Sequence, residues 1–222
     1  MFSKVFKSLC AGCGEECGYD KILCPECVAG LPRPKIFCEG CGHPLAVPAE
    51  HCRHCEDSEC GIDRYYGDYL YTGVMRDVIH RIKYYWRWRG AGQLGELCEA
   101  ATLNPVKYDR MAPIPFHFLR SFARYVQPVS VIADSLMRRG FIRGKTLIRK
   151  VHTEHQSKLS RNQRRLNVKG VFEVNEDVQG MNILIVDDII TSGATVTEAA
   201  KTLKHKGAAR VDVYTLLTGV SR

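Results

Sequence analysis

The hydrophobic positions in the C-terminal part of the chain change from a continuous apolar run to helical spacing and back. Ile183 to Val186 is an unbroken apolar run, which is typical of a strand in a parallel sheet covered on both faces. Ala194 to Lys206 has helical spacing, and we expect a cap near Thr191 or Ser192. Val211 to Leu217 is apolar again. A strand, a turn, a helix and a strand in this order predict a right-handed βαβ unit.

The middle of the chain has the same alternating character. Asp68 to Tyr71 predicts a short strand, and Val74 to Lys83 predicts a helix whose apolar residues fall on one face. Tyr108 to Pro115, YDRMAPIP, predicts a strand that ends in a rigid proline loop. Val129 to Arg139 predicts a further helix. Alternating strands and helices predict an α/β domain with a parallel sheet.

The first 60 residues contain many cysteines and few of the large apolar side chains that form the core of an independently folded domain. Ten of the eleven cysteines lie between Cys10 and Cys60. Eight of them form four pairs, each with a two-residue gap: Cys10 and Cys13, Cys24 and Cys27, Cys38 and Cys41, and Cys52 and Cys55. Ten residues separate the first pair from the second, and ten also separate the third from the fourth, so the motif is repeated.

This spacing predicts zinc sites. Two thiolates of one tight turn can face one ion, and two such pairs complete a tetrahedral site with sulfur about 2.3 Å from the metal. The alternative is a disulfide framework, which the lack of a secretory signal disfavours. We therefore expect the eight cysteines to hold one or two structural Zn²⁺ ions. Two sequential ribbons and a cross-braced pair that mixes the first and third cysteine pairs fit the sequence equally well.

Residues 1–60 are expected to form a small double zinc-ribbon domain and residues 61–222 the α/β domain, because so few large apolar side chains can scarcely make a core without metal. The remaining cysteines are expected to be free thiols, and three histidines are alternative ligands. These are Cys17, Cys60 and Cys98, and His43, His51 and His54.

Two adjacent acids follow the most apolar strand. Asp187 and Asp188 are expected at the C-terminal edge of the sheet, where ligands of open α/β sheets bind. Adjacent carboxylates repel each other unless hydroxyl donors or a cation such as Mg²⁺ compensate. The small residues from Thr191 to Thr195 then let backbone N–H groups approach an anion at the start of a helix. The pattern predicts a site for a sugar phosphate.

The run ILIVDDIITSGAT, Ile183 to Thr195, resembles the phosphoribosyl pyrophosphate (PRPP) signature of type I phosphoribosyltransferases at all 13 positions. The resemblance implies a parallel sheet flanked by helices, and Mg²⁺ bound together with PRPP. It also implies that Asp187 and Asp188 hold the ribose 2′ and 3′ hydroxyls. The 5′-phosphate would be bound by Thr191, Ser192, Gly193, Ala194 and Thr195.

The cysteine repeat ahead of this signature is similar to the double zinc ribbon of the ComF family, which is associated with competence and DNA uptake. YTGVMRDVIHRIKY, from Tyr71, and RKVHTEHQSKLSRNQRRLNVKGVF, from Arg149, also resemble segments of that family. The resemblance covers nearly the whole chain. It implies a protein that binds PRPP and is linked to DNA uptake or nucleotide metabolism, with single-stranded DNA and proteins of the competence machinery as further partners.

The formal net charge of +8 is concentrated in one segment. Arg143 to Gly170 contains nine basic residues and a single acid, Glu154. This segment is either a solvated surface loop or, as the resemblance to type I transferases implies, a lid that closes over substrate and pyrophosphate. No segment approaches the ~20 apolar residues that span a bilayer, so we expect a cytoplasmic protein without a membrane span.

The residues that would promote catalysis are basic. Lys83, Arg124 and Arg164, together with Arg120, are candidates for stabilising the leaving diphosphate. However, the segment Arg124 to Pro128 reads RYVQP where ComF members usually carry Arg-Gly-Phe-Asn-Gln. Two classes of function therefore stay open. The chain is a phosphoribosyltransferase with an unknown acceptor, or a non-catalytic nucleic-acid-binding or sensor component of the DNA-uptake machinery.

Overall fold

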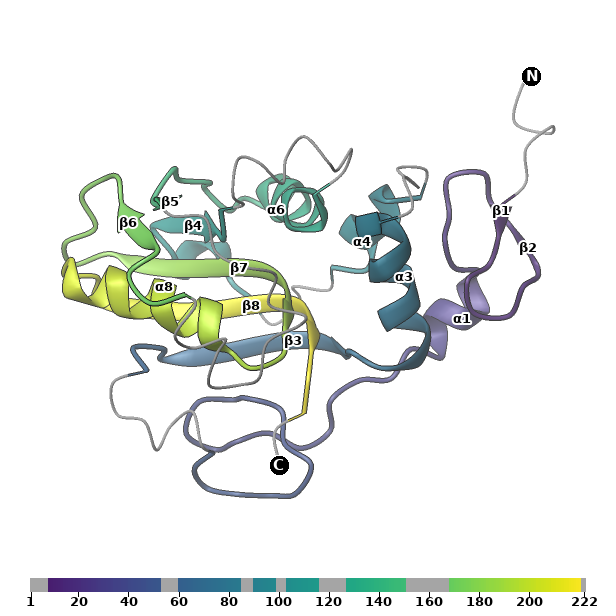
Figure 1. Ribbon diagram of the computed structural model, residues 1–222, viewed down its shortest axis with the longest axis horizontal. Coiled ribbons are helices and arrows are strands. Elements are labelled where there is room, and N and C mark those ends of the chain that lie inside the picture. Colours follow the sequence, from purple (N-terminus) through teal and green to yellow (C-terminus); the bar gives the residue numbers. More distant parts are fainter. Residues whose placement is uncertain are drawn as a thin grey trace.

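A four-stranded parallel sheet forms the centre of the molecule (Figure 1). The computed structural model describes residues 8–52, 60–84, 90–98, 103–115, 127–150 and 168–220. The strands run in the order β3, β8, β7, β4, and all three neighbouring pairs are parallel. Their bounds are β3 Arg64–Leu70, β8 Arg210–Thr218, β7 Asn182–Ile190 and β4 Arg110–Pro113.

Helices cover both faces of this sheet (Figure 1). One face packs against α3 (Gly73–Tyr84), α4 (Gly92–Glu96) and α6 (Pro128–Arg138), and the other against α8 (Ala194–His205). Strand β7 serves both layers, because its side chains alternate. Leu184 and Val186 belong to the core that includes α3 and α6, whereas Ile183 and Ile185 belong to the core that includes α8. The α/β sandwich predicted from the apolar run is confirmed.

A separate antiparallel hairpin lies beside the sheet. It consists of β5 (Leu147–Arg149) and β6 (Phe172–Val174), with Arg149 opposite Phe172. The smaller elements are β1 Ser8–Leu9, β2 Glu16–Cys17, α1 Pro25–Ala29 and the 3-10 helix η2 Pro105–Lys107.

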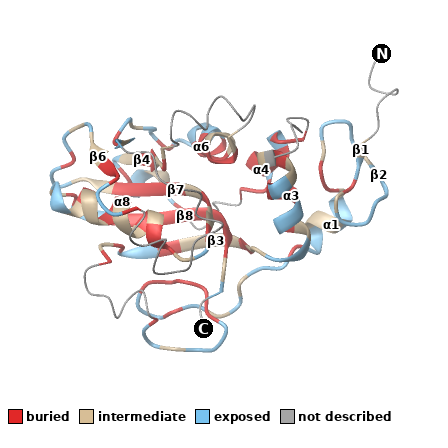
Figure 2. Ribbon diagram, viewed as in Figure 1, coloured by how far each residue is buried: buried red, intermediate tan, exposed pale blue. Residues whose placement is uncertain are grey.

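The cysteine-rich region forms two lobes that pack on the α/β domain at different places. The first ribbon, residues 8–31, lies next to α3 and α4, and the second ribbon, residues 36–52, lies below β3 (Figure 1). Leu23 and Leu31 share a core with Tyr69 and Met75. In the second ribbon, the buried positions join the core beneath α8 (Figure 2). Both ribbons therefore bury part of their apolar side chains against the α/β domain, whereas Leu9, Phe37 and Val47 are exposed. The domain boundary at residue 60 stays a prediction.

One buried glutamine fixes the first ribbon in place. The backbone N–H groups of Ile22 and Leu23 donate to Gln93 Oε1 at 2.8 and 2.9 Å, and Gln93 Nε2 donates to the Leu23 carbonyl at 2.8 Å. The nearby Gly90 has a φ of 78°, and a Cβ there would lie 2.6 Å from Ile22 Cγ1. The approach of the two backbones therefore requires glycine at this position.

Most element boundaries agree with the sequence. The helices α3 and α6 and the strand β8 begin and end within one residue of the predicted segments. Strand β3 is longer than predicted, since it begins at Arg64, and β7 continues past Val186 to Ile190. The sequence predicts a cap near Thr191 or Ser192, and the N-cap residue is the next one, Gly193, which is left-handed with a φ of 74°. Gly193 has no side chain to cap the helix, but the Ala194 N–H donates to Ser192 Oγ at 3.5 Å.

Candidate functional site

Asp187 and Asp188 lie on β7 just beyond the last residue that pairs with β4. The pairing between β4 and β7 ends at Pro113 and Val186, whereas β8 stays paired with β7 as far as Ile190 and Thr218. Asp187 and Asp188 are therefore still part of a strand, which the sequence did not predict. On the β4 side, however, they lie beyond the last paired residue. This is the C-terminal edge of the parallel sheet, where α/β proteins bind ligands.

Asp188 forms an ion pair with Lys83, one of the three residues predicted to promote catalysis. The distance from Lys83 Nζ to Asp188 Oδ2 is 2.6 Å, and the two side chains are 17% and 6% exposed. The side chains of β7 alternate regularly only as far as Val186, which faces the layer that contains α3. Beyond it, Ile189 packs against that layer and Ile190 belongs to the core that contains α8, so the pleat alone does not select which acid meets Lys83. Lys83 lies in the last turn of α3.

Asp187 has a perturbed acidity. Burial raises its pKa, and the negative charge of Asp188 raises it further, to about 7, although the positive charges of Lys83 and Arg149 oppose the shift. The backbone N–H of Asp188 donates to Asp187 Oδ1 at 2.9 Å. Near neutral pH this carboxylate therefore accepts a proton readily, and a bound cation or hydroxyl donors would relieve the same repulsion.

The turn after β7 leads directly into a twelve-residue helix. Gly193 supplies the left-handed backbone, and its carbonyl accepts from the Thr197 N–H at 2.9 Å. The Ala194 N–H lies 3.5 Å from Ser192 Oγ. Thr191 is exposed, whereas Gly193 and Ala194 are buried. Small residues thus bring the N-terminus of α8, with its positive dipole end, close to the two acids along the chain.

The hairpin β5–β6 places the ends of the basic segment near this turn. Arg149 is the last residue of β5, its guanidinium lies 5.7 Å from the centre of the Phe172 ring, and its charge acts on Asp187. At the other end, the Gly170 N–H donates to Glu198 Oε1 of α8 at 2.6 Å. Residues 151–167, which contain Lys158, Arg161, Arg164 and Arg165, lie outside the described residues, so the lid stays a prediction.

Two basic residues of this segment have other partners. Arg143 lies 3.3 Å from Asp134 of α6, and Lys150 lies 2.9 Å from Glu173 of β6. These contacts are at exposed side chains and contribute little to stability. They show that part of the basic surplus is balanced within the fold itself.

The other candidates for diphosphate stabilisation, Arg120, Arg124 and Arg164, lie outside the described residues. Of the divergent RYVQP segment the structure describes only Gln127 and Pro128. Gln127 immediately precedes α6, and Pro128 is the first residue of that helix. Proline is favoured at this position because it has no N–H to leave without a partner and its φ suits the first turn. The proline in RYVQP therefore has a local structural reason.

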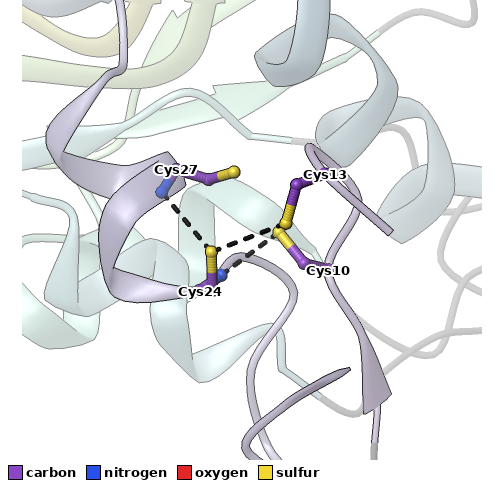
Figure 3. A group of neighbouring side chains, drawn as sticks. All are labelled: Cys10, Cys13, Cys24 and Cys27. Atoms are coloured by element: carbon purple, nitrogen blue, oxygen red, sulfur yellow. Dashed lines mark hydrogen bonds between the residues drawn. The ribbon is translucent and has the colours of Figure 1, made fainter. Parts of the chain in front are cut away.

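The first two cysteine pairs form one cluster (Figure 3). The Sγ atoms of Cys10, Cys13, Cys24 and Cys27 all lie within 4.8 Å of one another, and Cys13 Sγ is 3.8 Å from Cys24 Sγ. A tetrahedral site with zinc–sulfur distances of about 2.3 Å has sulfurs about 3.8 Å apart. The four side chains therefore fit a zinc ion.

Backbone donors surround these sulfurs, as expected for thiolate ligands. The Gly12 N–H donates to Cys10 Sγ at 3.4 Å. The Cys24 N–H donates to Cys10 Sγ at 3.3 Å, and the Cys27 N–H donates to Cys24 Sγ at 3.5 Å (Figure 3). Burial raises the pKa of Cys10, but backbone hydrogen bonds from the cluster outweigh it and lower the pKa to about 6. A thiolate is thus favoured at this position.

Three cysteines of the third and fourth pairs form the second cluster. The Sγ atoms of Cys38, Cys41 and Cys52 lie within 4.8 Å of one another, and Cys41 Sγ is 3.6 Å from Cys52 Sγ. Cys55 lies outside the described residues. The structure therefore groups neighbouring cysteine pairs, as in two sequential ribbons, and not the first pair with the third.

The remaining cysteines and histidines of the predicted set are not members of either cluster among the described residues. His43 is fully buried and packs edge-on against Tyr65, with ring centres 5.0 Å apart. Cys98 Sγ lies 2.9 Å from the Tyr214 hydroxyl. Cys17, Cys60 and Cys98 form no disulfide bond with any cysteine that the structure describes. His51 is exposed, and His54 lies outside the described residues.

Sequence reasoning missed Gln93, which holds the first ribbon. Gln93 lies between Gly92 and Leu94 and is itself buried. A polar residue in a short, otherwise apolar and glycine-rich stretch is the only local sign of its role, and it does not reveal the partner.

A family model of the phosphoribosyl transferase domain matches residues 126–222, which contain β7, the turn, α8 and β8. None of the helices in the described ranges has the length and apolar character that crossing a bilayer requires. A hypoxanthine phosphoribosyltransferase from Staphylococcus aureus is similar in structure over 58% of this chain and 64% of its own, with 14% identity and a TM-score of 0.39.

The similarity to curated proteins extends over the cysteine-rich region as well. The DNA utilization protein YhgH of Escherichia coli is 29% identical over 94% of this chain and 89% of its own length. The competence protein ComFC of Bacillus subtilis is 31% identical over 67% of this chain and 62% of its own. Competence protein F of Haemophilus influenzae is 26% identical over 76% of this chain and 78% of its own length. Together with the phosphoribosyl transferase domain and the cysteine clusters, these relatives show that the chain is phosphoribosyltransferase-like and belongs to the ComF family.

Proposed function

We propose that this protein binds PRPP at the C-terminal end of β7 and transfers its phosphoribosyl group to an acceptor. One observation carries the proposal. Two acids at the edge of the sheet, Asp187 and Asp188, lead within a few residues through the left-handed Gly193 to the N-terminus of α8. The acids would accept hydrogen bonds from the ribose 2′ and 3′ hydroxyls. Thr191, Ser192, Gly193, Ala194 and Thr195 would bind the 5′-phosphate.

The chemistry of this ligand requires charge stabilisation more than a nucleophile. When pyrophosphate leaves the anomeric carbon of the ribose, positive charge develops on the sugar and negative charge on the leaving group. In this proposal the two carboxylates would stabilise the former, and the ammonium of Lys83, which lies 2.6 Å from Asp188 Oδ2, would stabilise the latter. Mg²⁺, when bound to the diphosphate, would shield its charge, and the hard oxygens of Asp187 and Asp188 suit that ion.

We further propose that two Zn²⁺ ions are held, one by Cys10, Cys13, Cys24 and Cys27 and one by Cys38, Cys41, Cys52 and Cys55. The spacing of the described sulfurs supports this assignment. In this proposal residues 1–60 form the zinc-ribbon domain and residues 61–222 the phosphoribosyltransferase-like domain. Thiolate ligands of this kind persist in a reducing compartment, which favours the cytoplasm.

A link to DNA uptake is supported by the names of the relatives, which are competence and DNA utilization proteins. Single-stranded DNA and other proteins of the competence machinery are the partners that this link suggests. It also supports a second candidate function, in which the site binds PRPP as a sensor without turnover. The net charge of +8 is compatible with a nucleic-acid partner in either case.

Calorimetric titration of the zinc-loaded protein with PRPP and Mg²⁺ tests the shared part of both functions. A panel of nucleobases, with pyrophosphate release as the readout, then separates them. Binding with release in the presence of one acceptor is the expected result for the enzyme. Binding without release from any acceptor supports the sensor, and the lack of PRPP binding refutes both.

A further inference from the structure

In the free protein, Lys83 contacts a carboxylate oxygen that the proposed ribose site needs. Lys83 Nζ lies 2.6 Å from Asp188 Oδ2, so the ammonium already occupies one of the two oxygens that sugar hydroxyls would contact. Both side chains are largely buried. In such a pair neither charge can lose its partner without a replacement, because an unpaired buried charge is strongly destabilising.

The replacement partner is available in the ligand. A lysine carries three donors on a flexible four-carbon stem, so its ammonium can move several ångströms without a change in the backbone. A diphosphate offers it a denser negative charge than a single carboxylate. Asp188, once released, would accept hydrogen bonds from the ribose hydroxyls in place of those from the ammonium.

We propose that Lys83 exchanges partners, from Asp188 in the free protein to the diphosphate in the complex, so that the diphosphate and the ribose phosphate bind cooperatively. The inference rests on the proposed function and adds to it a coupling between the two ends of the ligand. Because coupling is reciprocal, each fragment should raise the affinity for the other by the same factor. A fragment that carries only one end would bind weakly, which would favour intact PRPP over ribose 5-phosphate.

The coupling is measured in the wild-type protein with two fragments. The affinity for ribose 5-phosphate is determined by calorimetry with and without saturating magnesium methylenediphosphonate, a diphosphate that is not hydrolysed. Typical coupling between sites is about 5- to 150-fold, and we expect a gain of about tenfold. Titration in the opposite order should give the same factor.

The variants then identify the residue. In Lys83→Met the gain in ribose 5-phosphate affinity that the diphosphonate produces should fall to a factor of about one. Ribose 5-phosphate alone should bind at least as tightly as to wild type, because no ammonium competes for Asp188. Lys83→Arg, which keeps the charge, should retain part of the coupling. Lys107→Met removes an exposed lysine of η2 and should behave as wild type. A purely structural role of Lys83 would instead weaken the binding of each fragment alone.

Each outcome decides one question. Equal ribose 5-phosphate affinity with and without the diphosphonate in wild type overturns the exchange of partners but leaves the PRPP site in place. An undiminished factor in Lys83→Met overturns the role of Lys83. If wild type binds neither PRPP nor ribose 5-phosphate under any condition, the proposed function itself fails. Should Lys83→Met not fold, the wild-type factor and Lys83→Arg still decide.

Discussion

Substitution of the two adjacent acids by asparagine should change stability in opposite directions. Asp187→Asn removes a carboxylate whose pKa is raised from 3.8 to about 7 by burial and by the charge of Asp188. An acid with a raised pKa in the folded state makes the protein less stable as the pH rises from the unfolded pKa to the folded one. For Asp187 this window runs from about pH 4 to about pH 7, and above it the loss is complete.

The magnitude follows from the shift. A difference of about three pKa units at about 1.36 kcal/mol per unit is an upper limit of about 4 kcal/mol. Asp187→Asn removes this penalty, so at pH 8 it should stabilise the ligand-free protein by up to this amount. Asp188→Asn instead leaves Lys83 without its carboxylate. Breaking a fully buried pair costs about 3–5 kcal/mol. Because the Lys83 side chain keeps 17% exposure, we expect a loss of about 1–3 kcal/mol.

Urea unfolding of the zinc-loaded protein between pH 5 and about pH 8 measures both effects. The slope of stability against pH should be negative in wild type and flatter in Asp187→Asn. Asp77→Asn, which changes an exposed carboxylate on α3, is the control and should follow wild type. If the two site variants shift stability in the same direction, the assignment of Lys83 to Asp188 alone is wrong. If Asp187→Asn keeps the wild-type slope, the raised pKa of Asp187 is wrong.

Four further results are expected. The double variant Asp187→Asn with Asp188→Asn should bind PRPP at least about a hundredfold more weakly, from two lost hydrogen bonds of about 1.5–3 kcal/mol each, and equal calorimetric affinity would refute the ribose assignment. Elemental analysis should find one to two zinc equivalents and fewer in Cys10→Ser, whereas less than half an equivalent in fresh, reduced wild type contradicts the clusters. Gln93→Leu leaves three backbone groups of the first ribbon unsatisfied and should cost about 2–4 kcal/mol in urea unfolding; an unchanged midpoint would show that the contacts are dispensable. Trypsin cleavage from Arg161 to Arg165 should slow with PRPP and Mg²⁺, and equal rates would count against a lid.

The helices were predictable because their apolar spacing records a single buried face. Val78, Ile79 and Ile82 of α3 are all buried, as are Ile132 and Leu136 of α6. Nothing comparable exists for the start of β3, where Arg64 is exposed and a glycine interrupts the strand. This part is a strand because it pairs with β8, with Arg64 opposite Asp212. Local sequence does not contain that information, since the pairing joins distant parts of the chain.

The same reason explains the errors at the end of β7. Its sequence turns polar after Val186, and a strand that ends there is the natural prediction. Pairing with β8 continues nevertheless, with Asp187 opposite Thr215 and Ile190 opposite Thr218. The acids are thus held by a strand and not by a loop, which fixes their directions. Rigid elements hold binding groups more accurately than loops do.

The partner of Lys83 was within reach of the sequence once the fold was known. Met75 and Ile79 are buried on α3, and Lys83 follows at the next step of four residues, so it extends an apolar stripe. A charge on such a stripe requires a carboxylate opposite it. The alternation of β7 does not select the acid, because after Val186 it is Ile189 that packs against the core of α3, whereas Ile190 belongs to the core of α8. The helical period therefore predicts that Lys83 needs an acid, and the fold that brings α3 to the end of β7 shows that this acid is Asp188.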